Sequence, residues 1–149
     1  MARIEEELNT NFKEEHQRML SNILFTTNWI RQRFEAVMKP FGLSGQQFNV
    51  LRILRGAGDW LNMNEMRERM IEKSPNTTRL VDKLVDKEWV IRRRCDVDRR
   101  VVHLKISEAG LALLTKVDEV DPNEAISFIQ NLTEEEMRTL SNLLDKIRG

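Results

Sequence analysis

The 149-residue chain has little of what several classes of protein require. Its one cysteine, Cys95, excludes a disulfide framework within the chain. No apolar run reaches the ~18–20 residues that a membrane-spanning helix needs. The acidic stretch 1–11 has no hydrophobic segment of the kind found in signal peptides. We therefore expect a cytoplasmic protein with no membrane partner.

Patterns that indicate catalysis or metal binding are also scarce. The two histidines, His16 and His103, lie far apart in the sequence, and no carboxylate spacing suggests a shared metal site. His16 falls in the apolar register of the first expected helix, which favours a core or interface position. The chain has no glycine-rich phosphate loop and no recognised nucleophile motif. These absences argue against an enzyme, a metal site and a bound cofactor.

Net charge is zero, because 24 Lys and Arg balance 24 Asp and Glu. This excludes a uniformly basic nucleic-acid binder, but the charges are not evenly spread. Residues 67–105 hold twelve basic and seven acidic side chains, whereas the rest of the chain holds twelve and seventeen. A basic centre with acidic flanks suits a protein whose middle faces a polyanion. Ordinary scatter of surface charge would give the same pattern, so charge alone leaves both interpretations open.

Helical periodicity dominates the first half of the chain. Residues 8–38 have no Pro or Gly, and their apolar side chains recur mostly every three or four positions, which predicts a helix about 45 Å long. That length exceeds a compact domain of this size, so part of it is expected to pack on a partner chain. Capping boxes at 44–47 and 62–65 predict the next two helices. Ser74 and Pro75 then begin a fourth, which is expected to run to about Lys87.

The second half begins with a β-hairpin. Two β-rich runs at 89–94 and 101–106 flank a polar tip at 95–100. Ser107 is expected to cap a further helix, Pro122 to break or kink it, and a capping box at 133–136 to begin the last helix.

This order of elements predicts a mainly α (α+β) single domain. Two short helices followed by a hairpin are typical of a winged helix-turn-helix. The DNA-binding part is expected at about 44–106. The flanking helices, at about 8–39 and 107–148, are expected to form the dimerisation part.

The helix predicted after Ser74 has the two faces of a DNA-recognition helix. Apolar side chains lie on one side together with Thr77, and polar side chains lie opposite. Arg and Asn read base edges in the major groove, and a helix N-terminus binds phosphate. The candidate DNA-binding residues are Ser74, Asn76, Thr78, Arg79 and Lys83. A plain amphipathic helix with a solvated face would look the same.

The hairpin tip favours DNA binding over that alternative. Asp98, Arg99 and Arg100 lie where a wing would reach the minor groove, whose negative potential attracts arginine. We expect Asp98 to hold one guanidinium in a bidentate pair while the other reaches outward. A turn with a weak surface ion pair is the alternative. A recognition helix, a hairpin and a basic tip in this order together favour duplex DNA as the partner.

These residues resemble the MarR family of bacterial transcription regulators. The specific matches are SPNTTRLVDKL at 74–84, WVIRR at 89–93 and DRRVVHLKISEAG at 98–110, supported by GLS and QF within 42–48 and LTEEE at 132–136. The resemblance implies a homodimer with interleaved first and last helices that binds a pseudo-palindromic site. It also implies that Arg99 enters the minor groove, that Asp98 and Arg100 brace the wing, and that a small ligand or oxidation controls binding.

Two kinds of sensing are candidates. A small-molecule effector pocket between the first, second and fifth helices would be lined by Trp29, Phe34, Met38 and Phe48, although such stripes are more often core. Cys95 follows three arginines, whose charge favours the reactive thiolate, and is a candidate redox switch beside the wing. An unreactive hairpin residue is the alternative.

The predicted function is a dimeric DNA-binding transcriptional regulator, acting as a repressor. The alternative from another class is a winged-helix protein-interaction module without specific DNA binding. The zero net charge motivates it, as do Asp82 and Asp86 on the expected DNA face.

Overall fold

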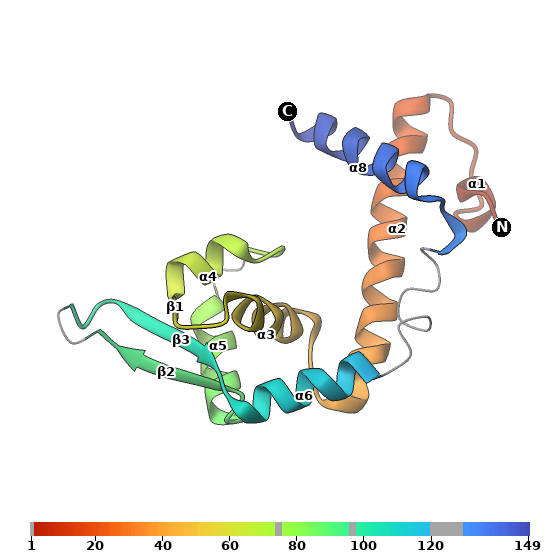
Figure 1. Ribbon diagram of the computed structural model, residues 1–149. Helices are drawn as coiled ribbons and strands as arrows, with labels where there is room; N and C mark the ends of the chain where they lie inside the picture. Colours follow the sequence, from red (N-terminus) through yellow and green to blue (C-terminus); the bar gives the residue numbers. More distant parts are fainter. Residues whose placement is uncertain (1, 74–75, 96–97, 120–129) are drawn as a thin grey trace.

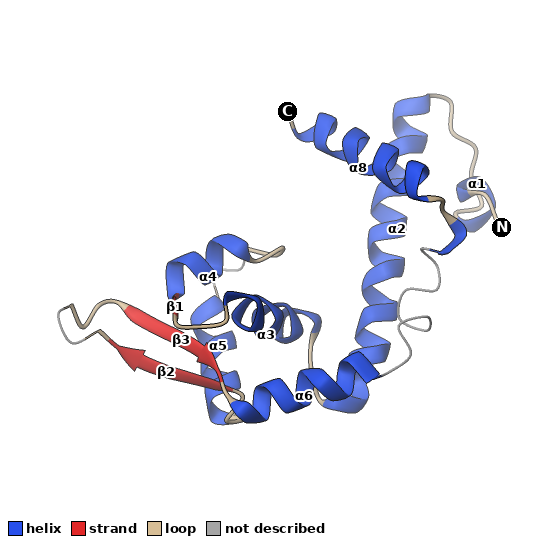
Figure 2. Ribbon diagram, viewed as in Figure 1, coloured by secondary structure: helices blue, strands red, loops and turns tan. Residues whose placement is uncertain are grey.

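The computed structural model describes residues 2–73, 76–95, 98–119 and 130–149 (Figure 1). Its helices and strands, in chain order, are α1 (Ile4–Glu7), α2 (Glu15–Met38), the 3-10 helix η1 (Lys39–Phe41), α3 (Gly45–Ala57), β1 (Leu61–Asn62), α4 (Met63–Arg69), α5 (Thr77–Asp86), β2 (Val90–Arg94), β3 (Val102–Ile106), α6 (Glu108–Glu119) and α8 (Glu134–Arg148). The strands form one antiparallel sheet in the order β1-β3-β2 (Figure 2). The prediction of a mainly helical chain with a small sheet is confirmed.

Local sequence signals explain where three helices begin. At α3 the amide of Gln47 donates to the Ser44 hydroxyl at 3.2 Å, and the Ser44 amide donates to the Gln47 side chain at 3.0 Å. The same reciprocal arrangement begins α4 and α8, at residues 62–65 and 133–136. Each box satisfies amides that have no partner inside the helix. All three capping boxes were predicted from the sequence and are confirmed.

A single apolar core joins α3, α4, α5, the sheet and α6. Its fully buried side chains include Val50, Leu51, Leu54, Met66, Val81, Leu84, Leu104 and Leu114. We call residues 45–106, from α3 to β3, the winged-helix body. The C-terminal end of α2 also enters this core, because Met38 is only 2% exposed.

The first long helix is shorter than predicted. It begins at Glu15, and α1 is separated from it by a turn in which Asn9 has a φ of 47°. The Thr10 amide donates to the Glu5 carbonyl oxygen at 3.0 Å. Asparagine tolerates this left-handed conformation, so the absence of Pro and Gly did not guarantee a continuous helix. The prediction of one helix over 8–38 was therefore wrong at its N-terminal end.

The expected recognition helix also begins later than predicted. Helix α5 starts at Thr77, with Asn76 as its N-cap, rather than at Ser74. Ser74 and Pro75 lie outside the described residues. The predicted break or kink at Pro122 lies outside them too.

The junction between α5 and the hairpin is tightly packed. Glu88 has a φ of 59°, and its carbonyl oxygen accepts a hydrogen bond from the Ser107 hydroxyl at 2.6 Å. The Ser107 hydroxyl in turn accepts the Gly110 amide at 3.0 Å, which confirms the predicted cap of α6. A Cβ on Gly110 would lie 2.4 Å from the Trp89 carbonyl oxygen. Only glycine therefore allows α6 to start this close to the hairpin.

The outer helices leave large apolar side chains exposed. Helix α2 extends away from the winged-helix body, and α8 lies near the N-terminal end of α2 (Figure 1). Leu24 on α2 is 65% exposed, and Leu143 and Ile147 on α8 are 54% and 55% exposed. Helix α8 has no buried residue. This agrees with the prediction that these helices cannot bury their apolar faces within one chain.

None of the helices in the described ranges is long and apolar enough to cross a membrane.

Candidate DNA-binding site

Helix α5 presents the two faces that the sequence predicted. Thr77, Val81 and Leu84 are fully buried against the core. The candidate residues Asn76, Thr78, Arg79 and Lys83 are all exposed. The buried face fixes the helix against α3 and the sheet, so its exposed face stands on a rigid support. Polar and cationic groups on such a face can bind the base edges and the phosphates of duplex DNA.

The hairpin extends beyond the core as a wing. Its strands pair from Val90 with Ile106 to Arg94 with Val102. At the tip, the Cys95 amide donates to the Val101 carbonyl oxygen at 2.9 Å, and the Val101 amide donates to the Asp98 carbonyl oxygen at 2.9 Å. These bonds close the turn.

Asp98 has a different contact from the one predicted. Its carboxylate accepts the backbone amide of Arg100 at 2.9 Å. Among the described residues it forms no ion pair with Arg99 or Arg100, so the predicted bidentate pair with a guanidinium was wrong. A local turn satisfies the carboxylate first, as is common when Asp precedes a turn amide by two residues. Both arginine side chains remain exposed at the tip.

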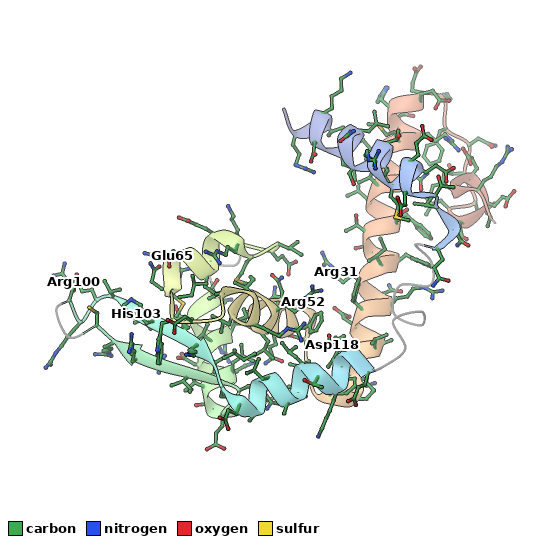
Figure 3. All side chains as sticks on the ribbon, viewed as in Figure 1. Arg31, Arg52, Glu65, Arg100, His103 and Asp118 are labelled. Atoms are coloured by element: carbon green, nitrogen blue, oxygen red, sulfur yellow. The ribbon has the colours of Figure 1, made fainter. Side chains whose placement is uncertain are left out.

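A cleft lies between the wing and the two short helices. Its volume is about 670 Å³. Figure 3 labels Glu65 and Arg100 on its two sides. Its lining residues are Asn62, Met63, Asn64, Glu65, Arg67, Glu68, Thr78, Arg92, Arg100, Val101 and Val102. Thr78, near the start of α5, and the wing residues from Arg92 to the tip thus border one surface.

The cleft is lined by more arginine side chains than carboxylates. Arg67, Arg92 and Arg100 line it, against the carboxylates of Glu65 and Glu68. The Nε of Arg67 is buried and has no hydrogen-bond partner among the described residues. Guanidinium groups bind phosphate oxygens in a fixed fork geometry. Arg67 and Arg92 were not among the predicted site residues, although the basic local charge of 67–105 pointed to this region.

An ion pair joins the recognition helix to the wing. Arg92 on β2 donates a hydrogen bond from its guanidinium to the carboxylate of Asp82 on α5. The pair offsets the negative charge of Asp82, which was one reason for the alternative of an interaction module. Asp86 on the same helix is exposed.

A cation–π contact and an ion pair attach the strands of the wing to residues 59–60 of the body. The Arg93 guanidinium lies over the Trp60 ring, 4.1 Å from its centroid. Lys105 Nζ lies 3.1 Å from Asp59 Oδ1. The Trp60 backbone amide, and then Lys105, lower the pKa of the Asp59 carboxyl below its usual value. These contacts fix the wing on the body and use Arg93 for stacking.

The residues predicted to line an effector pocket are spread through the core and the surface of α2. Met38 is buried in the core, and Phe48 packs against it. Trp29 and Phe34 are half-buried, and the Arg33 guanidinium lies 4.1 Å from the centroid of the Trp29 ring. The 670 Å³ cleft lies elsewhere, beside the wing. The effector role of these four residues stays a prediction.

The remaining candidates are placed as follows. Cys95 is half-buried at the base of the wing tip. His103 is half-buried on β3, and its Nδ1 has no hydrogen-bond partner among the described residues. His16 is exposed on α2, so the core position predicted for it was wrong, and an interface position stays a prediction. No cluster that could hold a metal ion occurs in the part of the chain that the structure describes.

The fold and the site together define a winged helix-turn-helix protein. The family model described as "MarR family" matches residues 43–102. The curated HTH-type transcriptional regulator MhqR of Bacillus subtilis (strain 168) is 32% identical over 71% of this chain and 72% of its own length. The chain belongs to the MarR family and is a DNA-binding transcriptional regulator rather than an enzyme.

Solved structures share the fold over most of the chain. A cysteine-to-serine mutant of MarR from E. coli, in complex with operator DNA, aligns with a TM-score of 0.79. It is 24% identical, over 93% of this chain and 99% of its own. The organohalide-sensing regulator RdhR in its 2,4-dichlorophenol-bound form aligns with a TM-score of 0.80. It is 20% identical, over 91% of this chain and 80% of its own. At these identities, the likeness concerns the fold.

Proposed function

We propose that the chain is a homodimeric transcriptional repressor that binds a pseudo-palindromic duplex site. The observation that carries the proposal is the position of one arginine-lined cleft, which is bordered by α4, by Thr78 at the start of α5 and by the wing. Helix α5 would lie in the major groove and the wing in the adjacent minor groove. That a MarR protein sharing this fold was solved in complex with operator DNA supports duplex DNA as the partner.

The individual side chains would contact different parts of the duplex. Asn76, Thr78, Arg79 and Lys83 would meet bases or phosphates in the major groove, with Ser74 beside them. Arg99 would enter the minor groove, while Asp98 shapes the turn and Arg100 lies at the cleft. Arg67 on α4 and Arg92 on β2 would face phosphates beside the wing. As a regulator of this kind acts on DNA, we place it in the cytoplasm.

The dimer would be built from the parts outside the winged-helix body. We assign about 44–106 to DNA binding, and about 8–39 and 107–148 to dimerisation. The exposed leucines and isoleucine of α2 and α8 support this division, because a partner chain would cover them.

Control of binding by a small molecule is part of the proposal. RdhR, which shares the fold, was solved with 2,4-dichlorophenol bound. The candidate effector residues are Trp29, Phe34, Met38 and Phe48. Oxidation of Cys95 is the alternative means of control, and DNA affinity that is unchanged by peroxide would exclude it.

The test is selection of binding sites from a random duplex library by the purified protein. A symmetric motif with half-sites about one helical turn apart is expected. Affinity for that motif should fall steeply with salt, in proportion to the number of phosphates neutralised. A library without enrichment, together with an affinity that is insensitive to salt, would instead support the protein-interaction module.

A further inference from the structure

Helix α2 and the winged-helix body meet at an angle. The helix is anchored at its C-terminal end, where Met38 is buried in the core. Farther from that end it diverges from the body (Figure 1). Arg31 lies seven residues before Met38, about 10 Å along the helix at 1.5 Å per residue. A contact made by Arg31 therefore acts well away from the buried anchor, where it can resist a change of angle.

Arg31 makes such a contact with the turn between α4 and α5. Figure 3 labels Arg31 on α2, and its Nη2 lies 3.6 Å from Oε1 of Glu72. The other carboxylate oxygen of Glu72 accepts a hydrogen bond from Nε2 of Gln46, on α3, at 2.5 Å. One carboxylate thus connects α2, the first helix of the body and the turn that leads into the recognition helix.

Met70 anchors the start of this turn in the apolar core, at 3% exposure, and the residues that follow it are held by polar contacts. Ile71 is 91% exposed, so its side chain contributes little packing. Its amide donates instead to the Asn49 side chain on α3 at 3.2 Å. The position of residues 71–73, beyond this anchor, therefore depends on the bonds that Glu72 makes with α2 and α3 and on the bond between the Ile71 amide and Asn49.

We propose that Arg31 and Glu72 are positioning residues that brace α2 against the helix-turn-helix and so fix the separation of the two recognition helices in the dimer. The inference rests on the proposed function, because it requires a dimer formed by the outer helices. If α2 belongs to the dimer interface, its angle to the body sets how far apart the two α5 helices lie. The brace then selects the half-site spacing that the protein accepts, and neither residue needs to touch DNA.

The size of the effect follows from the exposure of the pair. The two side chains are 57% and 53% exposed, so each brace contributes modestly. An exposed ion pair changes an equilibrium by about two- to fivefold, and the dimer holds two copies. We therefore expect a change in spacing preference of several-fold, without loss of folding.

The experiment uses charge reversal and its rescue in the full chain. Arg31→Glu, Glu72→Arg and the double variant are compared with wild type on duplexes that carry the selected half-sites at spacings differing by single base pairs. The measured quantity is the ratio of the DNA affinity at the preferred half-site spacing to the affinity at the adjacent spacing. Each single reversal should lower this affinity ratio about two- to fivefold, and the double variant should restore it. A ratio that is unchanged in the single variants, or not restored in the double, overturns the brace.

Two controls separate other causes. Glu7→Arg makes the same change of charge as Glu72→Arg at an exposed position of α1, outside the parts assigned to DNA binding and dimerisation, and should leave the affinity ratio unchanged. Arg31→Gln and Glu72→Gln serve if a reversal fails to fold, as judged by thermal melting. They should then lower the affinity ratio as well, and an unchanged ratio overturns the brace.

A second readout needs no DNA. A spin label on the natural Cys95 of each protomer gives a distance between the two wings of the dimer. We expect this distribution to broaden or shift in each single reversal and to recover in the double variant, and an unchanged distribution overturns the brace. A dimer that shows these changes but binds no duplex would keep the brace and overturn the proposed DNA function.

Discussion

Asp82 on the recognition helix accepts a hydrogen bond from the guanidinium of Arg92 on the first strand of the wing. Arg92 also lines the cleft beside the wing. A carboxylate on the predicted DNA face is thereby paired with a cation from a different element. The pair ties the orientation of α5 to that of the hairpin, and in the proposed complex it would reduce the repulsion between Asp82 and the phosphate backbone.

Removing Arg92 should weaken DNA binding in a way that depends on Asp82. Arg92→Ala leaves the Asp82 carboxylate without its cation, and we expect a loss of about 1 kcal/mol, because the pair is about half exposed. Adding Asp82→Asn should recover part of that loss. The measurement is fluorescence anisotropy of a labelled duplex with wild type, Arg92→Ala and the double variant, and equal losses of affinity in Arg92→Ala and the double variant would show that the pair plays no part.

Arg99 should contribute directly to the affinity for specific DNA. Its side chain is exposed at the wing tip, where it can reach the minor groove. We expect Arg99→Ala to cost about 1–3 kcal/mol of specific affinity and to lower the salt slope by about one. Titrations of the selected duplex at several salt concentrations measure both quantities.

The matched control is Arg138→Ala, which removes the same charge from α8. It should leave affinity and salt slope unchanged, with the dimer verified by sedimentation for both proteins. Unaltered binding by a folded, dimeric Arg99→Ala protein would refute the wing assignment.

Gly110 should not tolerate even a methyl group. An added Cβ would lie 2.4 Å from the Trp89 carbonyl oxygen and 2.8 Å from Ile106 Cγ1, so α6 or the hairpin would have to move. We expect Gly110→Ala to lower the free energy of unfolding by about 1–3 kcal/mol. In contrast, Gly56→Ala in α3 meets nothing within 4 Å and should be neutral or stabilising. Urea unfolding of both variants distinguishes a local clash from a general effect of the added methyl group.

The last helix should weaken in acid. The Thr133 backbone amide, followed by its hydroxyl, lowers the pKa of the Glu136 carboxyl below its ordinary value of 4.5. Because the pKa is lower in the folded state, this contribution to stability is present above pH 4.5 and is lost as the pH falls through the lowered value. The Tm of wild type should therefore decline relative to that of Glu136→Gln over this range. Parallel declines in the two proteins would contradict the capping role of the charge.

The elements that the sequence predicted correctly are those controlled by local chemistry. The capping boxes at 44–47, 62–65 and 133–136 depend on side chains three residues apart, so they can be recognised without a fold. The inward position of Thr77 followed from helical periodicity, and the hairpin followed from the change of period near residue 89. The turn at Asn9 is also a local feature, since asparagine tolerates left-handed turns, but the prediction rested on apolar spacing and on the absence of Pro and Gly alone.

The contacts that organise the site were not predictable in the same way. The pairs Asp82–Arg92 and Arg31–Glu72 join different elements, and their partners are known only once the helices have packed. The Asp98 carboxylate illustrates a competition that residue type alone does not decide. A nearby backbone amide and two guanidinium groups were all available, and the amide bond closes the turn.

The bare apolar face of α8 has a consequence for how much of the protein is folded at a given concentration. In the proposed dimer, this helix, which has no buried residue in its own chain, would gain its stability by mass action from the second chain that covers it. Dilution would then not only separate the protomers but also unfold the C-terminal helix. Since a lone winged-helix body offers a single half-site contact, DNA occupancy would follow the square of chain concentration. Expression level alone would therefore sharpen the response of the regulated promoter.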